Sequence, residues 1–259
     1  MMRPWWDFKN SPERLTDPAE HPQPDLYSVS QRFVTIESAF CGDPLTSKVL
    51  KNAWVGASIT SQLASALAVA EEAYNFEHRD LHLGNILIQR TDSVSLKYTI
   101  YDFHFSVQTV GHQAFIIDFN LSRIYGGDKV YCVSLDSCVS KDESSCEVSE
   151  NSWLHHGTIY KIMLEYSRGN WENFMPITNI IWLKYLIENI LEYLQRNNPG
   201  LRKLTAVDSE RDQMKAVRLL KKWNDCILEH KSAASFLRKV IFKDNPLVTI
   251  ERKYKNLNI

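Results

Sequence analysis

The chain has 259 residues, of which 44% are hydrophobic and 24% are charged, with only nine glycines and nine prolines. This composition is typical of soluble domains and excludes disorder or low complexity as a description of the whole chain. Thirty-one acidic residues balance thirty basic ones, the five cysteines form no C-x-x-C pair, and no signal peptide follows Met1. We therefore expect an intracellular protein that neither spans a membrane nor binds nucleic acid directly.

The chain begins with a segment of irregular composition. Proline recurs through residues 1–31 and interrupts any helical pattern there, which predicts a Pro-rich, partly ordered leader. The next residues, 32–37, read R-F-V-T-I-E and favour a β-strand that ends before a Gly-Asp-Pro turn. We expect one large domain to occupy residues 32–259.

The middle of the chain alternates between helical and extended patterns. Apolar residues recur every three or four positions from 56 to 75, which predicts an amphipathic helix. Short strands are expected at 86–88 and 115–117, and the alternation over 95–107, with a reversal near Asp102, predicts a β-hairpin. The remaining expected elements are a polar, Ser-rich surface loop at 126–152 and helices at 159–166, 177–195, 209–229 and 233–242.

Two motifs carry chemistry. Residues 78–85 read H-R-D-L-H-L-G-N, with the Asn five positions after the Asp, which is the spacing of a protein-kinase catalytic loop. There Asp80 would align a substrate hydroxyl for in-line attack, and Asn85 would lend its amide oxygen to magnesium. Downstream, I-I-D-F-N places Asp118 at the D-F-G position, where a carboxylate chelates the magnesium that bridges the ATP phosphates. Together the motifs predict a phosphoryl-transfer site that uses ATP and Mg²⁺.

These motifs resemble those of the haspin group of atypical protein kinases. The resemblance rests on H-R-D-L-H-x-G-N, which His82 and Gly84 reproduce, and on the D-F-N-L-S-R run from Asp118 to Arg123. Further matches are L-A-x-A-E at 67–71, V-S-x-D at 133–136 and N-x-x-W-L-x-Y-L at 179–186. The resemblance implies a protein-kinase-like α+β fold with a mainly α-helical large lobe, serine/threonine kinase activity, a protein substrate such as a histone-tail threonine, and a nuclear location.

The resemblance also assigns roles to single residues. His82 joins the catalytic residues at the position where most protein kinases have Lys, and His78 is expected to be a buried scaffold residue. Glu37 ends the hinge strand and is expected to contact the nucleotide. Asp136 is the acidic member of a pair that receives a basic histone tail, the second position being Cys138.

One further position departs from the family pattern. Thr158 stands where the family has an Asp that braces the catalytic loop, so we expect it to act only as a helix N-cap.

The parts of a kinase that grip the ATP phosphates are missing from the sequence pattern. Before Asp80 there is no G-x-G-x-x-G and no V-A-I-K, and none of Lys9, Lys48 and Lys51 lies in a strand-like run. We interpret the chain as a large lobe with most of the small lobe absent. Two functions remain open: an active serine/threonine kinase, or an inactive pseudokinase or large-lobe remnant that binds a peptide or protein partner.

Overall fold

The structure is a computed structural model that describes residues 7, 24–32, 37–46, 49–136, 138, 156–197 and 208–251. The chain divides into two compact units, Met1–Phe40 and Cys41–Ile259. In the first unit, the described residues include the short 3-10 helix η2 (Pro24–Leu26). Most of the strand expected at 32–37 lies outside the described residues, and the domain boundary at residues 31 and 32 stays a prediction.

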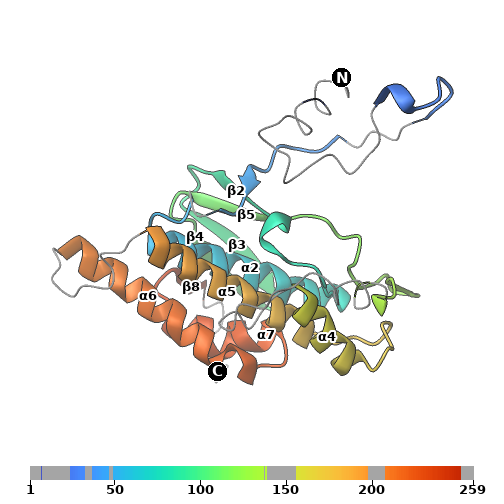
Figure 1. Ribbon diagram of the computed structural model, residues 1–259. Coiled ribbons are helices and arrows are strands. Elements are labelled where there is room, and N and C mark those ends of the chain that lie inside the picture. The colour runs from blue at the N-terminus through green and yellow to red at the C-terminus, as the bar shows by residue number, and fades with distance from the viewer. Residues whose placement is uncertain are drawn as a thin grey trace. The chain divides into compact units, whose positions relative to one another are not determined.

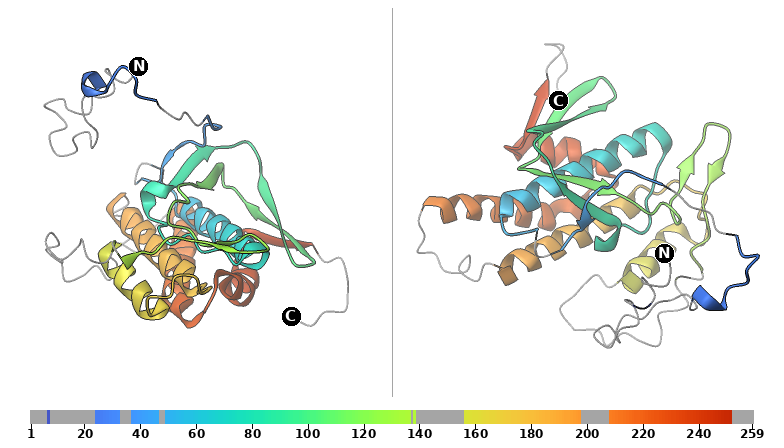
Figure 2. Two further views of the ribbon diagram at one scale, coloured as in Figure 1. Left: turned by 90° about the vertical axis from the view of Figure 1, so that its right-hand side faces the viewer. Right: turned by 90° about the horizontal axis from the view of Figure 1, so that it is seen from above.

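Helix α2 (Ala53–Tyr74) runs through the middle of the second unit, with β-strands on one side and helices α5 (Ile177–Asn197), α6 (Asp208–Cys226) and α7 (Ala233–Phe236) on the other (Figures 1 and 2). It begins at Asn52, whose Oδ1 accepts a hydrogen bond from the backbone N–H of Trp54, and ends at Asn75 in the left-handed conformation. Gly56 allows close packing against α5, because a Cβ there would lie 2.7 Å from Ile190 Cγ2. The predicted helix is confirmed.

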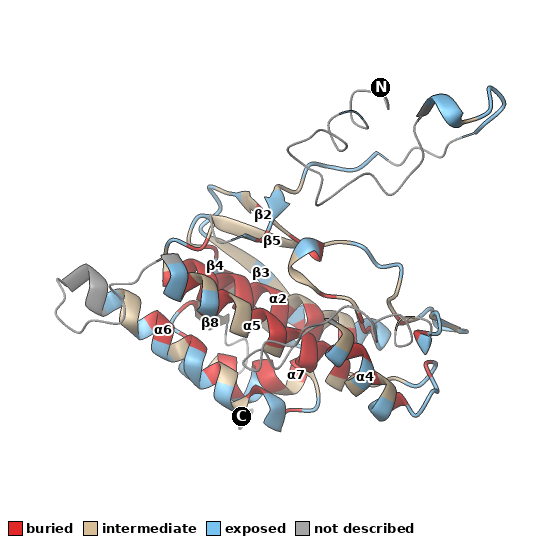
Figure 3. Ribbon diagram, viewed as in Figure 1, coloured by how far each residue is buried: buried red, intermediate tan, exposed pale blue. Residues whose placement is uncertain are grey.

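Its predicted amphipathic character is wrong, because α2 is buried almost all round along its first four turns (Figure 3). The polar residues on it find partners inside the protein. The hydroxyls of Thr60, Ser61 and Ser65 donate to carbonyls four residues earlier, and Gln62 bonds to the backbone of strand β5. By length and composition α2 could cross a membrane, yet 78% of its most apolar window is buried inside the protein. Its apolar surface therefore builds the core.

The strands form three small antiparallel sheets. The strands predicted near 86–88 and 115–117 and the predicted hairpin are confirmed, and the hairpin reverses at Tyr101 and Asp102. Strand β8 was not predicted, because its V-T-I-E sequence is short and finds its partner, β4, far back in the chain. The sheets are β1 (Asp43–Pro44), β2 (Ile86–Arg90) and β5 (His112–Ile116); β3 (Ser95–Ile100), β4 (Phe103–Gln108) and β8 (Val248–Glu251); and β6 (Ile124–Tyr125) with β7 (Val130–Tyr131).

The second half of the described chain is helical, as predicted. Helix α4 starts two residues before Thr158, so the expectation that Thr158 is an N-cap is wrong. Only the last predicted helix is interrupted, by one π-helical turn. The elements are α4 (His156–Ser167), α5 (Ile177–Asn197), α6 (Asp208–Cys226), η5 (Ile227–Glu229), α7 (Ala233–Phe236), the π-helical turn η6 (Leu237–Ile241) and α8 (Phe242–Asp244).

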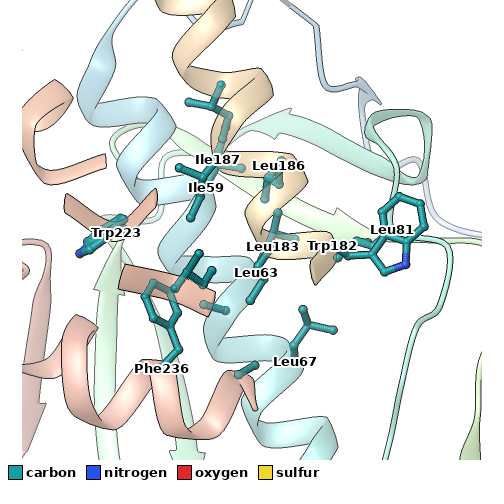
Figure 4. Close-up of a cluster of buried hydrophobic side chains, with 14 of the residues drawn as sticks. Ile59, Leu63, Leu67, Leu81, Trp182, Leu183, Leu186, Ile187, Trp223 and Phe236 are labelled. Atoms are coloured by element: carbon teal, nitrogen blue, oxygen red, sulfur yellow. The ribbon is translucent and has the colours of Figure 1, made fainter. Parts of the chain in front are cut away.

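The core lies between α2 and the helices beside it (Figure 4). Apolar side chains of α2 meet those of α5, and each fully buried aliphatic side chain contributes roughly 1.5–3 kcal/mol. Leu81 enters the same core beside Trp182 (Figure 4), so the residue that follows Asp80 anchors the loop. The labelled members are Ile59, Leu63 and Leu67 of α2, Leu183, Leu186 and Ile187 of α5, Trp223 of α6 and Phe236 of α7.

Glu71 joins three helices through one buried carboxylate. Its oxygens accept hydrogen bonds from Asn179 Nδ2 at 3.0 Å and from the backbone N–H groups of Ala233 and Ala234 at 3.0 and 2.9 Å. The side chain is almost fully buried, and this burial raises the pKa of Glu71 to about 7 even though the three donors oppose the shift.

The raised pKa of Glu71 predicts a dependence of stability on pH. Between about pH 4.5 and 7 the folded protein keeps a proton on Glu71 that the unfolded chain has released, so the free energy of unfolding falls as the pH rises through this window, by up to about 3 kcal/mol. Glu71→Gln should remove this slope in urea unfolding measured across that range. Glu72→Gln, which changes the exposed neighbour, should keep it, and equal slopes in both variants would contradict the assignment.

Candidate active site

The catalytic-loop segment (residues 76–85) follows α2 directly and is organised around His78. The backbone N–H of His78 donates to Asn179 Oδ1 at 3.0 Å, and its Nδ1 accepts from the backbone N–H of Asp80 at 3.3 Å. Its Nε2 lies 3.0 Å from the carbonyl oxygen of Ile117, so this nitrogen carries the proton. Burial lowers the pKa of His78, which keeps the ring neutral. The expectation of a buried scaffold histidine is confirmed.

Asp80 and Asn85 are in direct contact. Asn85 Nδ2 donates to the backbone carbonyl of Asp80 at 2.9 Å and lies 3.5 Å from its Oδ2. The hydroxyl of Tyr160, from α4, donates to Asp80 Oδ1 at 2.6 Å. Since the Asn85 amide nitrogen faces Asp80, the side-chain oxygen of Asn85 is left to accept from, or coordinate, another group.

His82 shapes the loop between these two residues. Its Nδ1 accepts from the backbone N–H of Gly84 at 3.0 Å and so caps the 3-10 turn η3 (Leu83–Asn85) that presents Asn85. A Cβ on Gly84 would lie only 2.8 Å from His82 Cε1, so the histidine and the glycine are required together. His82 Nε2 lies 3.9 Å from Asp80 Oδ2. This geometry makes His82 a positioning residue, and its expected place among the catalytic residues stays a prediction.

The metal-loop segment (residues 116–123) is tied to the catalytic-loop segment through its backbone. Ile117 N–H donates to the carbonyl of Asn85 at 3.0 Å, and the Ile117 carbonyl accepts from His78. Asp118 follows in a left-handed conformation (φ 61°), exposed, with its Oδ1 accepting from Asn120 N–H at 3.3 Å. Strand β5 ends at Ile116, two residues before Asp118, and is half-buried along its length. The structure places Asp80, Asn85 and Asp118, the residues of the predicted phosphoryl-transfer site, in one cluster of loops.

A buried ionic network lies beneath these loops. The carboxylate of Glu77 accepts from Arg79 at 3.1 and 3.2 Å, from Met175 N–H at 2.8 Å and from the hydroxyl of Thr178 at 2.9 Å. Arg123, at the end of the metal-loop segment, lies 3.8 Å from the same carboxylate and forms a two-way backbone bridge with Glu77. The network therefore joins both loops to the start of α5.

Three important residues were missed from the sequence. Tyr160 and Trp171 contact the loops from distant positions in the chain, and Glu77, although it stands beside the H-R-D motif, is not marked by any local pattern. The Trp171 carbonyl accepts from Arg79 at 2.8 Å, while its indole Nε1 donates to Asp136 at 3.0 Å.

The two other predicted site residues lie in different surroundings. Asp136 is exposed, and its carboxylate accepts hydrogen bonds from the indole N–H of Trp171 and from the hydroxyl of Ser134. Both bonds lower the pKa of Asp136, and the bond from Trp171 has the larger effect. Glu37 is an exposed residue of the first unit, so its expected contact with the nucleotide stays a prediction.

Two hollows border the loops. A groove of about 730 Å³ beside the metal-loop segment is lined by Phe76, Phe119, Asn120 and residues 129–133. Phe119 is 57% exposed there, against the rings of Phe76 and His78. A second recess of about 430 Å³ is lined by Ser134 and by residues 168–172. Its lining thus includes Ser134 and Trp171, the two hydrogen-bond partners of Asp136.

Comparison with known proteins shows what the chain is similar to. Residues 9–243 match a family model described as a haspin like kinase domain. The chain is 35% identical over 174 residues to a serine/threonine-protein kinase haspin homolog of Drosophila melanogaster, covering 67% of this chain and 30% of that protein. It is 32% identical over 206 residues to serine/threonine-protein kinase haspin of Bos taurus (77% and 25%). The matches to the Drosophila and Bos proteins thus span about a quarter to a third of their length.

The buried network predicts a large loss of stability when its centre is changed. Glu77→Gln leaves the guanidinium groups of Arg79 and Arg123 buried without a counter-charge, so the free energy of unfolding should fall by about 3 kcal/mol or more. Glu192→Gln is the matched control, because it breaks only the exposed pair with Arg196 on α5 and should cost less than about 0.5 kcal/mol. Urea unfolding at pH 7 measures both. A loss below about 1 kcal/mol for Glu77→Gln would show that the network is not the constraint described.

Proposed function

We propose a function from one premise: this chain belongs to the haspin family of protein kinases, whose model covers residues 9–243. The relatives that it matches are named serine/threonine-protein kinases. The proposed activity is the transfer of the γ-phosphoryl group of ATP to a serine or threonine hydroxyl of a protein substrate. The observation that carries this proposal is that Asp80 contacts both Asn85 and Tyr160. The backbone of Asn85 is in turn hydrogen-bonded to Ile117, the residue before Asp118.

Asp80 is the residue that would receive the substrate hydroxyl. Because Tyr160 occupies Oδ1, the second oxygen, Oδ2, is the one that would accept a hydrogen bond from that hydroxyl, orient its lone pair for in-line attack and take its proton. The Tyr160 bond and the anchoring of Leu81 in the core restrict the rotation of the carboxylate. This restriction matters because positioning supplies much of the catalysis in phosphoryl transfer.

The donor set of the site fits magnesium. The side-chain oxygen of Asn85 and the carboxylate of Asp118 are hard oxygen ligands, and Asp118 Oδ1 has a single backbone donor, Asn120, among the described residues. Magnesium bound there would neutralise charge on the ATP phosphates. Asn85 and Asp118 would hold it, while Glu37 would contact the adenine side of the nucleotide.

The proposed substrate is a basic peptide such as a histone tail. Asp136 keeps its negative charge, since two hydrogen bonds lower its pKa, and it adjoins the recess at residues 168–172. Cys138 contributes no charge, so the attraction is weaker than two carboxylates would give. A histone substrate would place the protein in the nucleus.

A second candidate function is a pseudokinase or a large-lobe module that binds a peptide or a partner. It is favoured by the lack of a Gly-rich loop and of a strand lysine in the sequence before Asp80. We propose that these 259 residues carry the large lobe and lack most of the small lobe. The two candidates differ in one result, the transfer of phosphate by the chain alone.

Asp80→Asn tests the kinase proposal. The variant loses the acceptor for the hydroxyl proton, so the rate of transfer from radiolabelled Mg-ATP to a Ser- or Thr-containing basic peptide should fall at least about 100-fold. Asp102→Asn, in the exposed hairpin turn, is the control and should leave the rate unchanged. If the unaltered chain transfers no phosphate but binds the peptide, the second candidate function holds instead.

Binding of nucleotide should be weak and should require magnesium, because the proposed metal ligands are present while the loop that covers the phosphates is not. Calorimetric titration of the chain with ATP, with and without Mg²⁺, measures this. Asp118→Asn should abolish the part of the affinity that depends on magnesium. Tight binding of ATP in the presence of a chelator would contradict the proposed arrangement.

A further inference from the structure

A basic recess lies where the C-terminal end of α2 meets the last helical segment, outside the catalytic-loop and metal-loop segments. It has a volume of about 510 Å³. Three cations, Arg238, Lys239 and Lys243, line it together with the hydroxyl residues Ser232 and Ser235, and Glu72 contributes the one carboxylate among its lining residues.

The π-helical turn η6 gathers these cations. In a continuous α-helix, residues five apart are separated by about 140° around the axis, because each residue turns the chain by about 100°. Here the backbone N–H of Phe242 donates to the carbonyl of Leu237, which is the i→i+5 bond of a π-helix. This wider turn brings Arg238 and Lys243 toward one side while Leu237 and Ile241 stay in the core. Single π turns occur frequently at functional sites.

The described residues place one carboxylate, that of Glu72, among the three cations that line the recess. Among the described residues, no carboxylate lies within 4 Å of the side-chain nitrogens of Arg238, Lys239 or Lys243, whereas nearby Lys222 is paired with Asp244. Glu72 also interacts with the hairpin residue Tyr101, and this interaction raises the pKa of Tyr101. Three like charges around one hollow repel one another, so an anion bound there relieves that repulsion.

We propose that this recess binds the phosphate group of a phosphorylated serine or threonine in a peptide. A guanidinium and two ammonium groups around one hollow suit a single dianionic phosphate, and the serine hydroxyls add hydrogen-bonding capacity. Nucleic acid would need a longer row of cations, and the formal charge of −1 offers no wider field for one. The source of the ligand rests on the proposed function, since a serine/threonine kinase acts on such peptides. A substrate that already carries a phosphate would be held at this second point while another residue meets Asp80.

The test is fluorescence anisotropy with a labelled ten-residue peptide that carries one phosphoserine, beside the same peptide with serine. The full chain should bind the phosphopeptide at least tenfold more tightly. Replacing Arg238, Lys239 and Lys243 together by Gln should weaken phosphopeptide binding at least tenfold. The matched control replaces three exposed cations of α6, Lys215, Arg218 and Lys221, by Gln, which changes the net charge equally and should alter Kd less than twofold.

Three outcomes would overturn the proposal. The first is equal affinity for the two peptides, and the second is an equal loss of affinity in the α6 control. The third is tighter binding to vesicles that contain anionic lipid than to the phosphopeptide, which would assign the recess to a lipid headgroup. The test is independent of the kinase reaction, because Asp80→Asn should bind the phosphopeptide like the unaltered chain. Loss of transfer in Asp80→Asn therefore bears on the proposed function alone, and loss of phosphopeptide binding in the recess variant bears on this site alone.

Discussion

The burial of one carboxylate, that of Glu77, is the constraint on which the arrangement of the site depends. A charge removed from water is stable only when it is fully paired and hydrogen-bonded, so Glu77 fixes the position of every group that satisfies it. Those groups come from the catalytic-loop segment through Arg79, from the metal-loop segment through Arg123, and from the start of α5 through Met175 and Thr178. None of these elements can move far without leaving a buried charge unpaired.

This network and the hydrogen bonds between the two loop segments support backbone conformations that are unfavourable by themselves. Arg79 has φ of 67° and Asp118 has φ of 61°, in the left-handed region that non-glycine residues seldom adopt, at a cost of about 1–3 kcal/mol each. Arg79 precedes Asp80 directly, and the backbone of Ile117 holds the approach to Asp118 through two hydrogen bonds. Buried pairing with Glu77 thus offsets the strain at Arg79, and the hydrogen bonds of Ile117 with His78 and Asn85 hold the backbone that leads into the strained Asp118.

Local patterns predicted much of this protein, and partnerships across the chain account for what they missed. The spacing of Asp80 and Asn85 and the D-F-N motif indicated which two loops would lie together, and alternation predicted the hairpin. The all-round burial of α2, the pairing of β8 and the bond from Tyr160 to Asp80 could not be predicted, because each depends on elements that lie elsewhere in the chain. The π turn η6 was not predicted for a different reason. Its sequence has ordinary helical periodicity, and only its hydrogen bonds distinguish it from an α-helix.

Strand β8 has a consequence for the order in which the protein folds. Its residues Val248–Glu251 complete the sheet of the β3–β4 hairpin, on the edge formed by His104–Val107. During synthesis that edge emerges from the ribosome long before its partner, with unpaired N–H and C=O groups that can recruit other chains. Because closure of so long a loop is entropically costly, this sheet should be completed late in folding. Until β8 pairs with it, the hairpin edge is therefore a place where the nascent protein can pair with other chains.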